Sequence, residues 1–238
     1  MIDESIFREY DIRGIVPDQI NDLSVKAIAK AIAIKCRNEL VDEIVLGRDG
    51  RLSGDNLLSF LSRELQSCGL NVVNIGIVSS PLLYYAAKKI NSKSGIMITG
   101  SHNPKNYNGF KIVIDDSPVS GMEILDLISD ELVNYKNSGN EIVKKDIIDE
   151  YIKEVMSQSS SSVNPMKIVV DCGNGSAGEI APKLIRCLGH QVIELFCKID
   201  GNFPNHHPDP GKIENLQDLI KVVKNESADI GIAFDGDG

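Results

Sequence analysis

Tryptophan is absent from this 238-residue sequence, and aromatic residues make up only 5% of it. No run or stripe of lysine and arginine appears, and the formal net charge is −9. A nucleic-acid partner held by general electrostatic attraction is therefore excluded, and an anionic substrate would need local cations. The hydrophobic content of 42% is that of a folded chain with one large or two modest domains.

Paired cysteines, a leader peptide and long apolar runs are also missing. The five cysteines are odd in number and include no CxxC pair, which indicates reduced thiols and predicts a cytoplasmic protein. The first residues lack the basic and apolar regions of a signal peptide, and no apolar run approaches the length of a bilayer span. We therefore expect no membrane partner. The cysteines are Cys36, Cys68, Cys172, Cys187 and Cys197.

Short apolar runs alternate with helical periods through most of the chain. Strands are expected at 43–47, 71–75, 93–99, 110–114, 166–171, 191–196 and 229–234. Helices are expected at 21–40, 55–68, from 79 onward, and at 122–135, 146–156, 180–187 and 213–224. This alternation predicts two layered α/β domains with mixed, largely parallel sheets flanked by helices.

One low-complexity tract divides the sequence. Residues 157–165 contain five serines and end in Asn164-Pro165, which is typical of a connection between domains. The predicted domains are therefore residues 1–156 and residues 166–238.

The opening segment, residues 5–16, reads as extended. It interleaves Arg8 and Arg13 with aromatic and aliphatic residues, a pattern typical of a solvated edge strand. An arginine beside a glycine, as Arg13 is beside Gly14, can also reach an anion.

The strand expected at 93–99 is followed by a loop that contains Ser101. Gly100, Ser101, His102 and Asn103 follow the apolar run, and Pro104 prevents a regular continuation. One interpretation is a turn in which Gly100 relieves strain while Ser101 and Asn103 bond their own backbone. The other makes Ser101 a nucleophile or phosphoryl carrier, and the local sequence leaves both open.

The last four residues alternate carboxylates with glycines. Asp235 and Asp237, each followed by glycine, would let the backbone curl so that oxygens converge on a hard cation such as Mg²⁺ or Ca²⁺. A solvated turn is the alternative. The position directly after an apolar strand that is expected to be buried favours the metal, because α/β sites form at strand ends.

A glycine-rich loop follows the strand at 166–171. Gly173, Gly175 and Gly178 match the spacing of a dinucleotide fingerprint, but no acidic partner stands at the end of the next strand. A tight structural turn is therefore favoured over a site for NAD.

The segment 200–211 contains the adjacent pair His206 and His207. Adjacent side chains rarely chelate one ion well, and no further ligand spacing supports zinc. The three prolines of this segment instead favour a rigid surface loop or domain-contact loop.

Four stretches together resemble the α-D-phosphohexomutase superfamily, and most closely its bacterial phosphomannomutase/phosphoglucomutase branch. They occur in the family's order and extend the resemblance over essentially the whole chain. They are residues 8–14, 99–111, 201–210 and 235–238. Thr99-Gly100 before the serine is more similar to this branch than to the phosphoglucosamine mutases, which remain an alternative.

The resemblance implies that Ser101 is carried as phosphoserine and that Ser101, Asp235 and Asp237 hold Mg²⁺. It further implies that hexose 1-phosphate and 6-phosphate are interconverted through a sugar bisphosphate, which also acts as activator. Phosphoryl transfer needs mainly positioning and charge neutralisation. Lys111 and His102 are candidates for general acid/base groups, and Arg13 could steady a phosphate or order the loop.

One departure from the family concerns the metal loop. The family's loop reads D-G-D-G-D-R, whereas this sequence ends at Gly238. We therefore expect an N-terminal fragment with negligible turnover by itself, whose partners would be the missing C-terminal domains of the same chain. The alternative from another class is a non-catalytic phosphate- or phosphosugar-binding module. A serine hydrolase is disfavoured because no G-x-S-x-G elbow surrounds Ser101.

Overall fold

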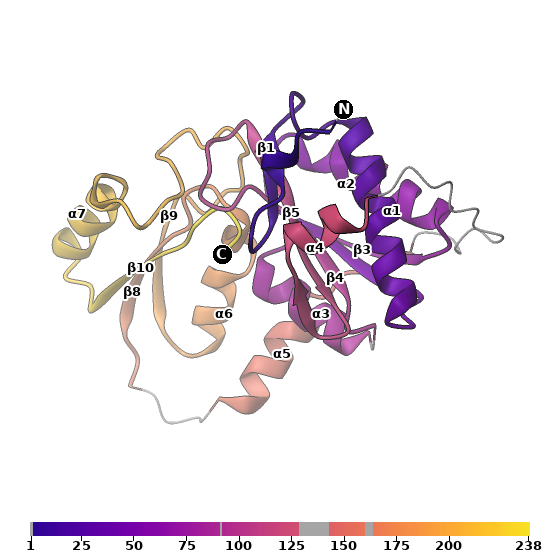
Figure 1. The fold of residues 1–238 in the computed structure, drawn as a ribbon. Coiled ribbons are helices and arrows are strands. Elements are labelled where there is room, and N and C mark those ends of the chain that lie inside the picture. Colours follow the sequence, from indigo (N-terminus) through magenta and orange to yellow (C-terminus); the bar gives the residue numbers. More distant parts are fainter. Residues whose placement is uncertain (1, 91, 129–142, 160–163) are drawn as a thin grey trace.

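Two sheets, one of seven strands and one of three, organise the described part of the chain (Figure 1). The structure is a computed structural model that describes residues 2–90, 92–128, 143–159 and 164–238. Helices flank both sheets, and Figure 1 shows the C-terminus at the junction between them. The predicted fold class, layered α/β with mixed and largely parallel sheets, is confirmed.

The larger sheet has the order β1-β5-β4-β2-β3-β7, with β6 paired to β5. Strands β2, β3, β4 and β7 are parallel, whereas β1, β5 and β6 run antiparallel to their neighbours. The strands are β1 (Ile12–Ile15), β2 (Glu43–Arg48), β3 (Asn71–Ile77), β4 (Gly95–Ile98), β5 (Tyr107–Ile114), β6 (Ser117–Val119) and β7 (Val143–Lys144).

Successive residues of the central strands enter different cores. On β2, Ile44 and Leu46 pack with helices α1, α2 and α4, whereas Val45 packs with α3 and α5 on the other face. This alternation follows from the two-residue period of a strand, and it explains why β2 is a continuous apolar run. The helices are α1 (Asp22–Asn38), α2 (Gly54–Ser67), α3 (Ser80–Lys89), α4 (Gly121–Asp126) and α5 (Ile148–Gln158), preceded by the 3₁₀ turn η1 (Glu4–Ile6).

The smaller sheet is entirely parallel, with the order β10-β8-β9. Its core is formed by Ile168, Val170 and Cys172 together with residues of the following loops. Its elements are β8 (Lys167–Asp171), η2 (Ser176–Glu179), α6 (Ala181–Cys187), β9 (Gln191–Leu195), η3 (Ile213–Leu216), α7 (Gln217–Asn225) and β10 (Ile230–Ala233).

Helix α5 contacts both halves of the molecule. Nζ of Lys89 on α3 lies 2.9 Å from Oε2 of Glu154. Nζ of Lys183 on α6 lies 2.6 Å from Oδ1 of Asp149. The helix also extends two residues into the predicted connection, of which residues 160–163 lie outside the described part of the chain. The domain boundary at 157–165 stays a prediction.

Two predictions about strand burial were wrong. β1 lies at the sheet edge, yet Ile12, Arg13 and Gly14 are buried, and Ile6 and Gln19 cover Gly14. β10, expected to be buried, is an edge strand whose Ile230 is 43% exposed. A period-based reading cannot see that β10 has a neighbour on one side only in the described sheet.

Two helix predictions were also corrected. The helix expected at 122–135 ends at Asp126, where the Leu127 amide donates to the Ile124 carbonyl in a tightened last turn, and residues 129–142 lie outside the described part. The helix expected from Ile213 begins with the 3₁₀ turn η3, and its α-helical part starts at Gln217. No helix in the described ranges has both the length and the apolar character needed to cross a bilayer.

The core of the larger domain yields a stability prediction. Leu61 of α2 is fully buried, so Leu61→Ala should lower the free energy of unfolding by about 2–5 kcal/mol through lost contacts and a cavity. Leu23→Ala, at a position 58% exposed on α1, serves as the control and should change it by less than about 0.5 kcal/mol. Urea unfolding followed by circular dichroism measures both, and equal effects would contradict the assigned core.

Candidate active site

Ser101 stands at the contact between the two domains. Its backbone adopts φ +50°, a left-handed conformation that is uncommon for serine, and its amide donates to Thr99 Oγ1 over 2.7 Å. Its hydroxyl donates to Asp235 Oδ2 over 2.7 Å. Ser101 is only 6% exposed. The two motifs that the sequence singled out separately thus meet through this hydroxyl.

A buried guanidinium fixes the conformation of the serine loop. Arg51 Nη2 donates to the carbonyls of Ser101 (2.8 Å) and Asn103 (2.7 Å), and Nη1 donates to those of Pro104 (2.6 Å) and Tyr107 (3.0 Å). The carbonyls of Ser101, Asn103 and Pro104 belong to the irregular loop between β4 and β5, and Tyr107 is the first residue of β5. Arg51 therefore supplies the hydrogen-bond donors that a neighbouring strand would supply in a sheet.

The charge of Arg51 is balanced by Asp49. Arg51 Nε lies 3.1 Å from Asp49 Oδ2, and both side chains are fully buried. Asp49 Oδ2 also accepts from Thr99 Oγ1 over 2.7 Å. Burial raises the pKa of the Asp49 carboxyl, while Arg51 and Thr99 oppose this rise. Asp49 thereby links Arg51 to the end of β4.

Gly100 has a different role from the one expected. A Cβ at this position would lie 2.5 Å from Arg51 Cζ, so the glycine gives the guanidinium room to pass. The left-handed strain lies at Ser101 itself. The amide of Asn103 does bond its local backbone, at the Gly100 carbonyl, whereas the Ser101 hydroxyl bonds Asp235. The simple-turn interpretation therefore describes Asn103 and not Ser101.

Asp237 is held by three contacts, two from Ser80 and one from Lys111. The Ser80 amide, at the start of α3, donates to its carbonyl over 2.8 Å, and the Ser80 hydroxyl bonds its carboxylate. Lys111 Nζ lies 2.6 Å from Asp237 Oδ2. Between the two aspartates, Gly236 passes so close to Ser101 that a Cβ would lie 2.5 Å from the Ser101 carbonyl oxygen. The loop after β10 is therefore fitted to the serine loop.

The two aspartates differ in electrostatics. Burial, and then repulsion from Asp237, raises the pKa of Asp235. Burial also opposes ionisation of Asp237, but Lys111 and the hydrogen bond from Ser80 outweigh it, and the pKa of Asp237 is lowered. The pair thus concentrates negative charge beside the Ser101 hydroxyl, with one carboxylate neutralised by Lys111.

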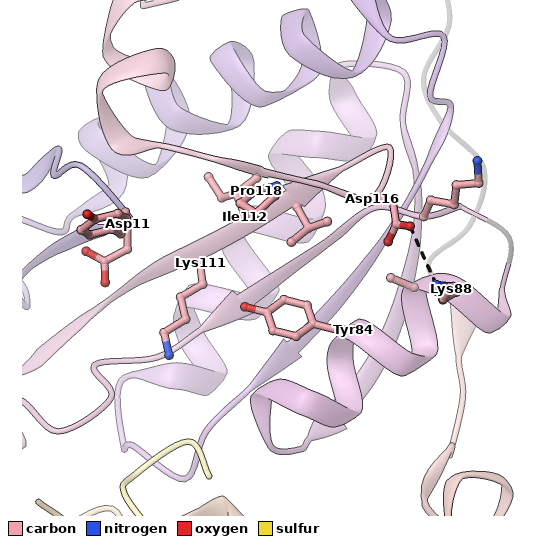
Figure 2. A pocket seen from close by; sticks show the side chains of 11 residues that line it. Asp11, Tyr84, Lys88, Lys111, Ile112, Asp116 and Pro118 are labelled. Carbon is pink, nitrogen blue, oxygen red and sulfur yellow. Dashed lines mark ion pairs between the residues drawn. The ribbon is translucent and has the colours of Figure 1, made fainter. Parts of the chain in front are cut away.

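Lys111 also lines a pocket. Figure 2 shows Lys111 of β5 and Tyr84 of α3 among the side chains that line a pocket. The pocket has a volume of ≈ 420 Å³, and Tyr10 also lines it. Lys111 is one of the two expected acid/base groups, and its ammonium contacts the carboxylate of Asp237. At another part of the pocket wall Lys88 pairs with Asp116 (Figure 2).

Arg13 and His102 lie outside the hydrogen-bonded cluster. Arg13 is buried and pairs with Asp11, while its Nε has no partner among the described residues. Burial lowers the pKa of Arg51, and the positive charge of Arg13 adds to this lowering. His102 is exposed, and its carbonyl accepts from His207 Nε2. The imidazole of His102 thus enters none of the hydrogen bonds within the described cluster.

The glycine-rich loop packs beneath the aspartates. A Cβ on Gly175 would lie 2.9 Å from the Asp235 carbonyl oxygen, and one on Gly178 would lie 1.9 Å from that of Cys197. The glycines are therefore required for close backbone approach, as the structural-turn interpretation predicts.

The two adjacent histidines bind different partners. His206 Nε2 lies 3.1 and 3.0 Å from the two carboxylate oxygens of Asp171, whereas His207 reaches the His102 carbonyl. In the same segment the Phe203 ring lies 5.3 Å from Arg51 Cζ. This segment therefore contacts the serine loop and Arg51, which agrees with the domain-contact alternative. Within the described ranges, no three histidine, cysteine, aspartate or glutamate side chains form a metal cluster.

Sequence reasoning missed Asp49, Arg51 and Ser80. Asp49 and Arg51 lie in a polar loop directly after β2. The same kind of position, directly after a strand, identified the aspartate loop after β10. Applied consistently, strand-end position would have found them. Ser80 was assigned only to the start of a helix, and nothing in its neighbours indicates the contact with Asp237.

The fold and the serine–aspartate junction define a chain of the phosphohexomutase type. The family model described as phosphoglucomutase/phosphomannomutase, alpha/beta/alpha domain I, matches residues 4–138, and that for alpha/beta/alpha domain II matches residues 149–238. The chain belongs to the phosphoglucomutase/phosphomannomutase family.

Individual relatives agree with this assignment. The chain is 48% identical over 242 residues to a phosphomannomutase/phosphoglucomutase of Pseudomonas syringae, covering 100% of this chain and 51% of that protein. It is 47% identical to a phosphoglucomutase of Neisseria meningitidis, with 99% and 52% covered. A solved phosphoglucomutase/phosphomannomutase family protein from Burkholderia thailandensis superposes with a TM-score of 0.93 at 40% identity, covering 100% of this chain and 54% of that one. The chain thus spans about half the length of these relatives.

The buried ion pair predicts a large stability effect. Arg51→Ala leaves Asp49 unpaired in the interior and removes the partner of four carbonyls, so the free energy of unfolding should fall by about 3–5 kcal/mol. Lys183→Ala removes the exposed pair with Asp149 and should cost less than about 1 kcal/mol. Urea unfolding distinguishes them, and a small effect at Arg51 would contradict the role given to this pair.

His206 predicts a pH-dependent contribution to stability. The hydrogen bond to Asp171 raises the pKa of His206 above its ordinary value of 6.5, despite partial burial. The contribution is therefore complete below that value and is lost as the pH rises through the raised native pKa. The difference in free energy of unfolding between the native protein and His206→Gln should be largest below about pH 6.5 and should shrink as the pH rises above it. A difference that is constant or grows as the pH rises would refute it.

Proposed function

We propose that Ser101 accepts and returns a phosphoryl group in an enzyme that interconverts hexose 1-phosphate and hexose 6-phosphate. The observation that carries this proposal is the 2.7 Å hydrogen bond between the Ser101 hydroxyl and Asp235, in a loop that also brings Asp237 and Lys111 together. A nucleophilic hydroxyl, two carboxylates and a cation are the parts that phosphoryl transfer uses.

The donor set at this junction suits Mg²⁺, which family membership implies. Ser101 Oγ and the carboxylates of Asp235 and Asp237 are hard oxygen donors, the ligands that Mg²⁺ prefers. Burial and then repulsion from Asp237 raise the pKa of Asp235, and a divalent cation would relieve that repulsion. When bound, Mg²⁺ would neutralise charge on a phosphate carried by Ser101.

The remaining roles belong to the chain's own cations. Lys111 stands between Asp237 and the pocket, where its ammonium can neutralise a phosphate or give a proton to a departing sugar oxygen. His102, the other acid/base candidate, is exposed, so we assign the proton to Lys111. Arg13, buried with its Nε unpartnered in the described structure, would steady a phosphate.

Mannose and glucose phosphates are the proposed substrates, and a sugar bisphosphate the proposed intermediate and activator. Relatives at 47–48% identity are named phosphomannomutase/phosphoglucomutase or phosphoglucomutase. They are about twice as long as this chain, so we expect residues 1–238 alone to show negligible turnover. A cytoplasmic location would follow from a phosphosugar substrate.

Phosphorylation of Ser101 tests the proposal. The chain incubated with Mg²⁺ and glucose 1,6-bisphosphate should gain one phosphoryl group by intact-protein mass spectrometry, mapped to Ser101. Ser101→Ala should abolish the gain, whereas Ser67→Ala, an exposed serine of α2, should leave it unchanged. One bisphosphate molecule gives one phosphoryl group to Ser101, so this gain in mass does not require repeated catalytic turnover.

Two results would reject the carrier role. One is a folded chain that binds the bisphosphate without gaining a phosphoryl group, which would instead indicate a non-catalytic phosphosugar-binding module. The other is a gain that persists in Ser101→Ala.

A further inference from the structure

Two thiols lie together beneath the aspartate loop. Cys172 follows β8 directly and Cys197 lies just beyond β9, and their sulfur atoms are 3.3 Å apart. The register of these parallel strands pairs Asp171 with Leu195, and the two cysteines follow these paired residues by one and two positions. Cys172 is fully buried, whereas Cys197 is 9% exposed.

We propose that Cys172 and Cys197 form a redox modification site, at which a hydroperoxide converts the two thiols into a reversible intramolecular disulfide. This inference is independent of phosphoryl transfer at Ser101. It rests on the contact of the two sulfur atoms and on the backbone that holds them.

The backbone geometry suits such a bond. The Cys172 amide donates to the Leu195 carbonyl over 3.1 Å, so the two cysteines extend from directly hydrogen-bonded strands. The sulfur atoms need to approach from 3.3 Å to about 2.05 Å. That displacement is within the reach of two side-chain rotations without separating the strands.

The two thiols differ in access to solvent, which orders the reaction: Cys197 is 9% exposed and can meet the peroxide first, whereas Cys172 is fully buried. Hydrogen bonding by Cys172 lowers the pKa of Cys197, whereas the same interaction and burial raise the pKa of Cys172. The Cys197 thiolate attacks one peroxide oxygen and breaks the O–O bond, giving a sulfenic acid and hydroxide. The Cys172 sulfur then attacks the Cys197 sulfur, expels hydroxide and gives up its own proton. Two thiols are oxidised, and hydrogen peroxide is reduced to two waters.

The disulfide would lie beneath the active-site junction. The Cys172 carbonyl accepts from the Gly175 amide over 2.7 Å, and the Ser176 amide donates to the Gly236 carbonyl over 3.1 Å. Gly236 in turn contacts the Ser101 carbonyl. Oxidation would therefore add a covalent link to the layer that supports the aspartate loop.

Other cysteines of the chain provide internal references. Cys187, at the end of α6, is exposed and accessible to any reagent. Burial raises the pKa of Cys36 to about 12, which makes it a poor nucleophile. Selective linkage of Cys172 to Cys197 would thus reflect their contact rather than general reactivity.

The experiment is oxidation of the folded chain by hydrogen peroxide, followed by thiol blocking and peptide mapping without reduction. We expect an intact mass lower by two hydrogens, a peptide that links Cys172 to Cys197, and reversal by dithiothreitol. Cys197→Ser should lower the yield of intramolecularly linked species at least about tenfold, whereas Cys187→Ser should leave it unchanged.

Three outcomes would overturn the proposal. They are oxidation of Cys187 with no Cys172–Cys197 link, conversion of Cys197 to sulfinic acid without a link, and a link that forms only in urea. Each is read from the unmutated chain, so the test stands even if Cys197→Ser does not fold. None of these readouts involves phosphoryl transfer, so its failure would be distinct from failure of the carrier role.

Discussion

The buried pair of Asp49 and Arg51 is the interaction on which the site depends. Removing a guanidinium and a carboxylate from water costs several kcal/mol per ion, and only good geometry with further hydrogen bonds offsets it. Here the guanidinium contacts its carboxylate, three carbonyls of the serine loop and the carbonyl of the first residue of β5. The loop conformation is thereby tied to the burial of a charge, and any other conformation would leave that charge unsatisfied. This is how Ser101 is kept in a left-handed conformation that directs its hydroxyl toward Asp235.

The second constraint is the concentration of negative charge at the junction of the two domains. Asp235 and Asp237 lie on the smaller domain, whereas Lys111, Ser80 and Ser101 lie on the larger one. From the part of the chain after residue 165, the Phe203 ring packs against the Arg51 guanidinium. His207 of the same segment bonds the His102 carbonyl in the serine loop. Helix α5 packs against both halves. The site is thus a property of the interface, and its charges favour the arrangement in which Lys111 meets Asp237.

Much of this arrangement could be predicted because its signals are local. Strand and helix periods located nearly every element, and Ser101 with Asp235 and Asp237 stood at strand ends, where α/β sites form. Strand-end position could have marked the loop of Asp49 and Arg51 as a candidate site. The carbonyls that Arg51 binds could not be predicted, because they lie 50 to 56 residues away in the sequence. The burial of β1 and the exposure of β10 depend on which elements cover them, which no period encodes. The exposed position of His102 likewise follows from the turn that Arg51 imposes.

Hydrogen exchange of the serine loop tests most directly whether Arg51 holds it. In Arg51→Lys, a variant that keeps a charge for Asp49 but loses the planar fork, peptides covering residues 99–107 should exchange roughly tenfold faster or more, while β2 and α1 keep their protection. Unchanged protection of residues 99–107 in a folded variant would contradict the account, because the loop would then hold its conformation without the four guanidinium contacts.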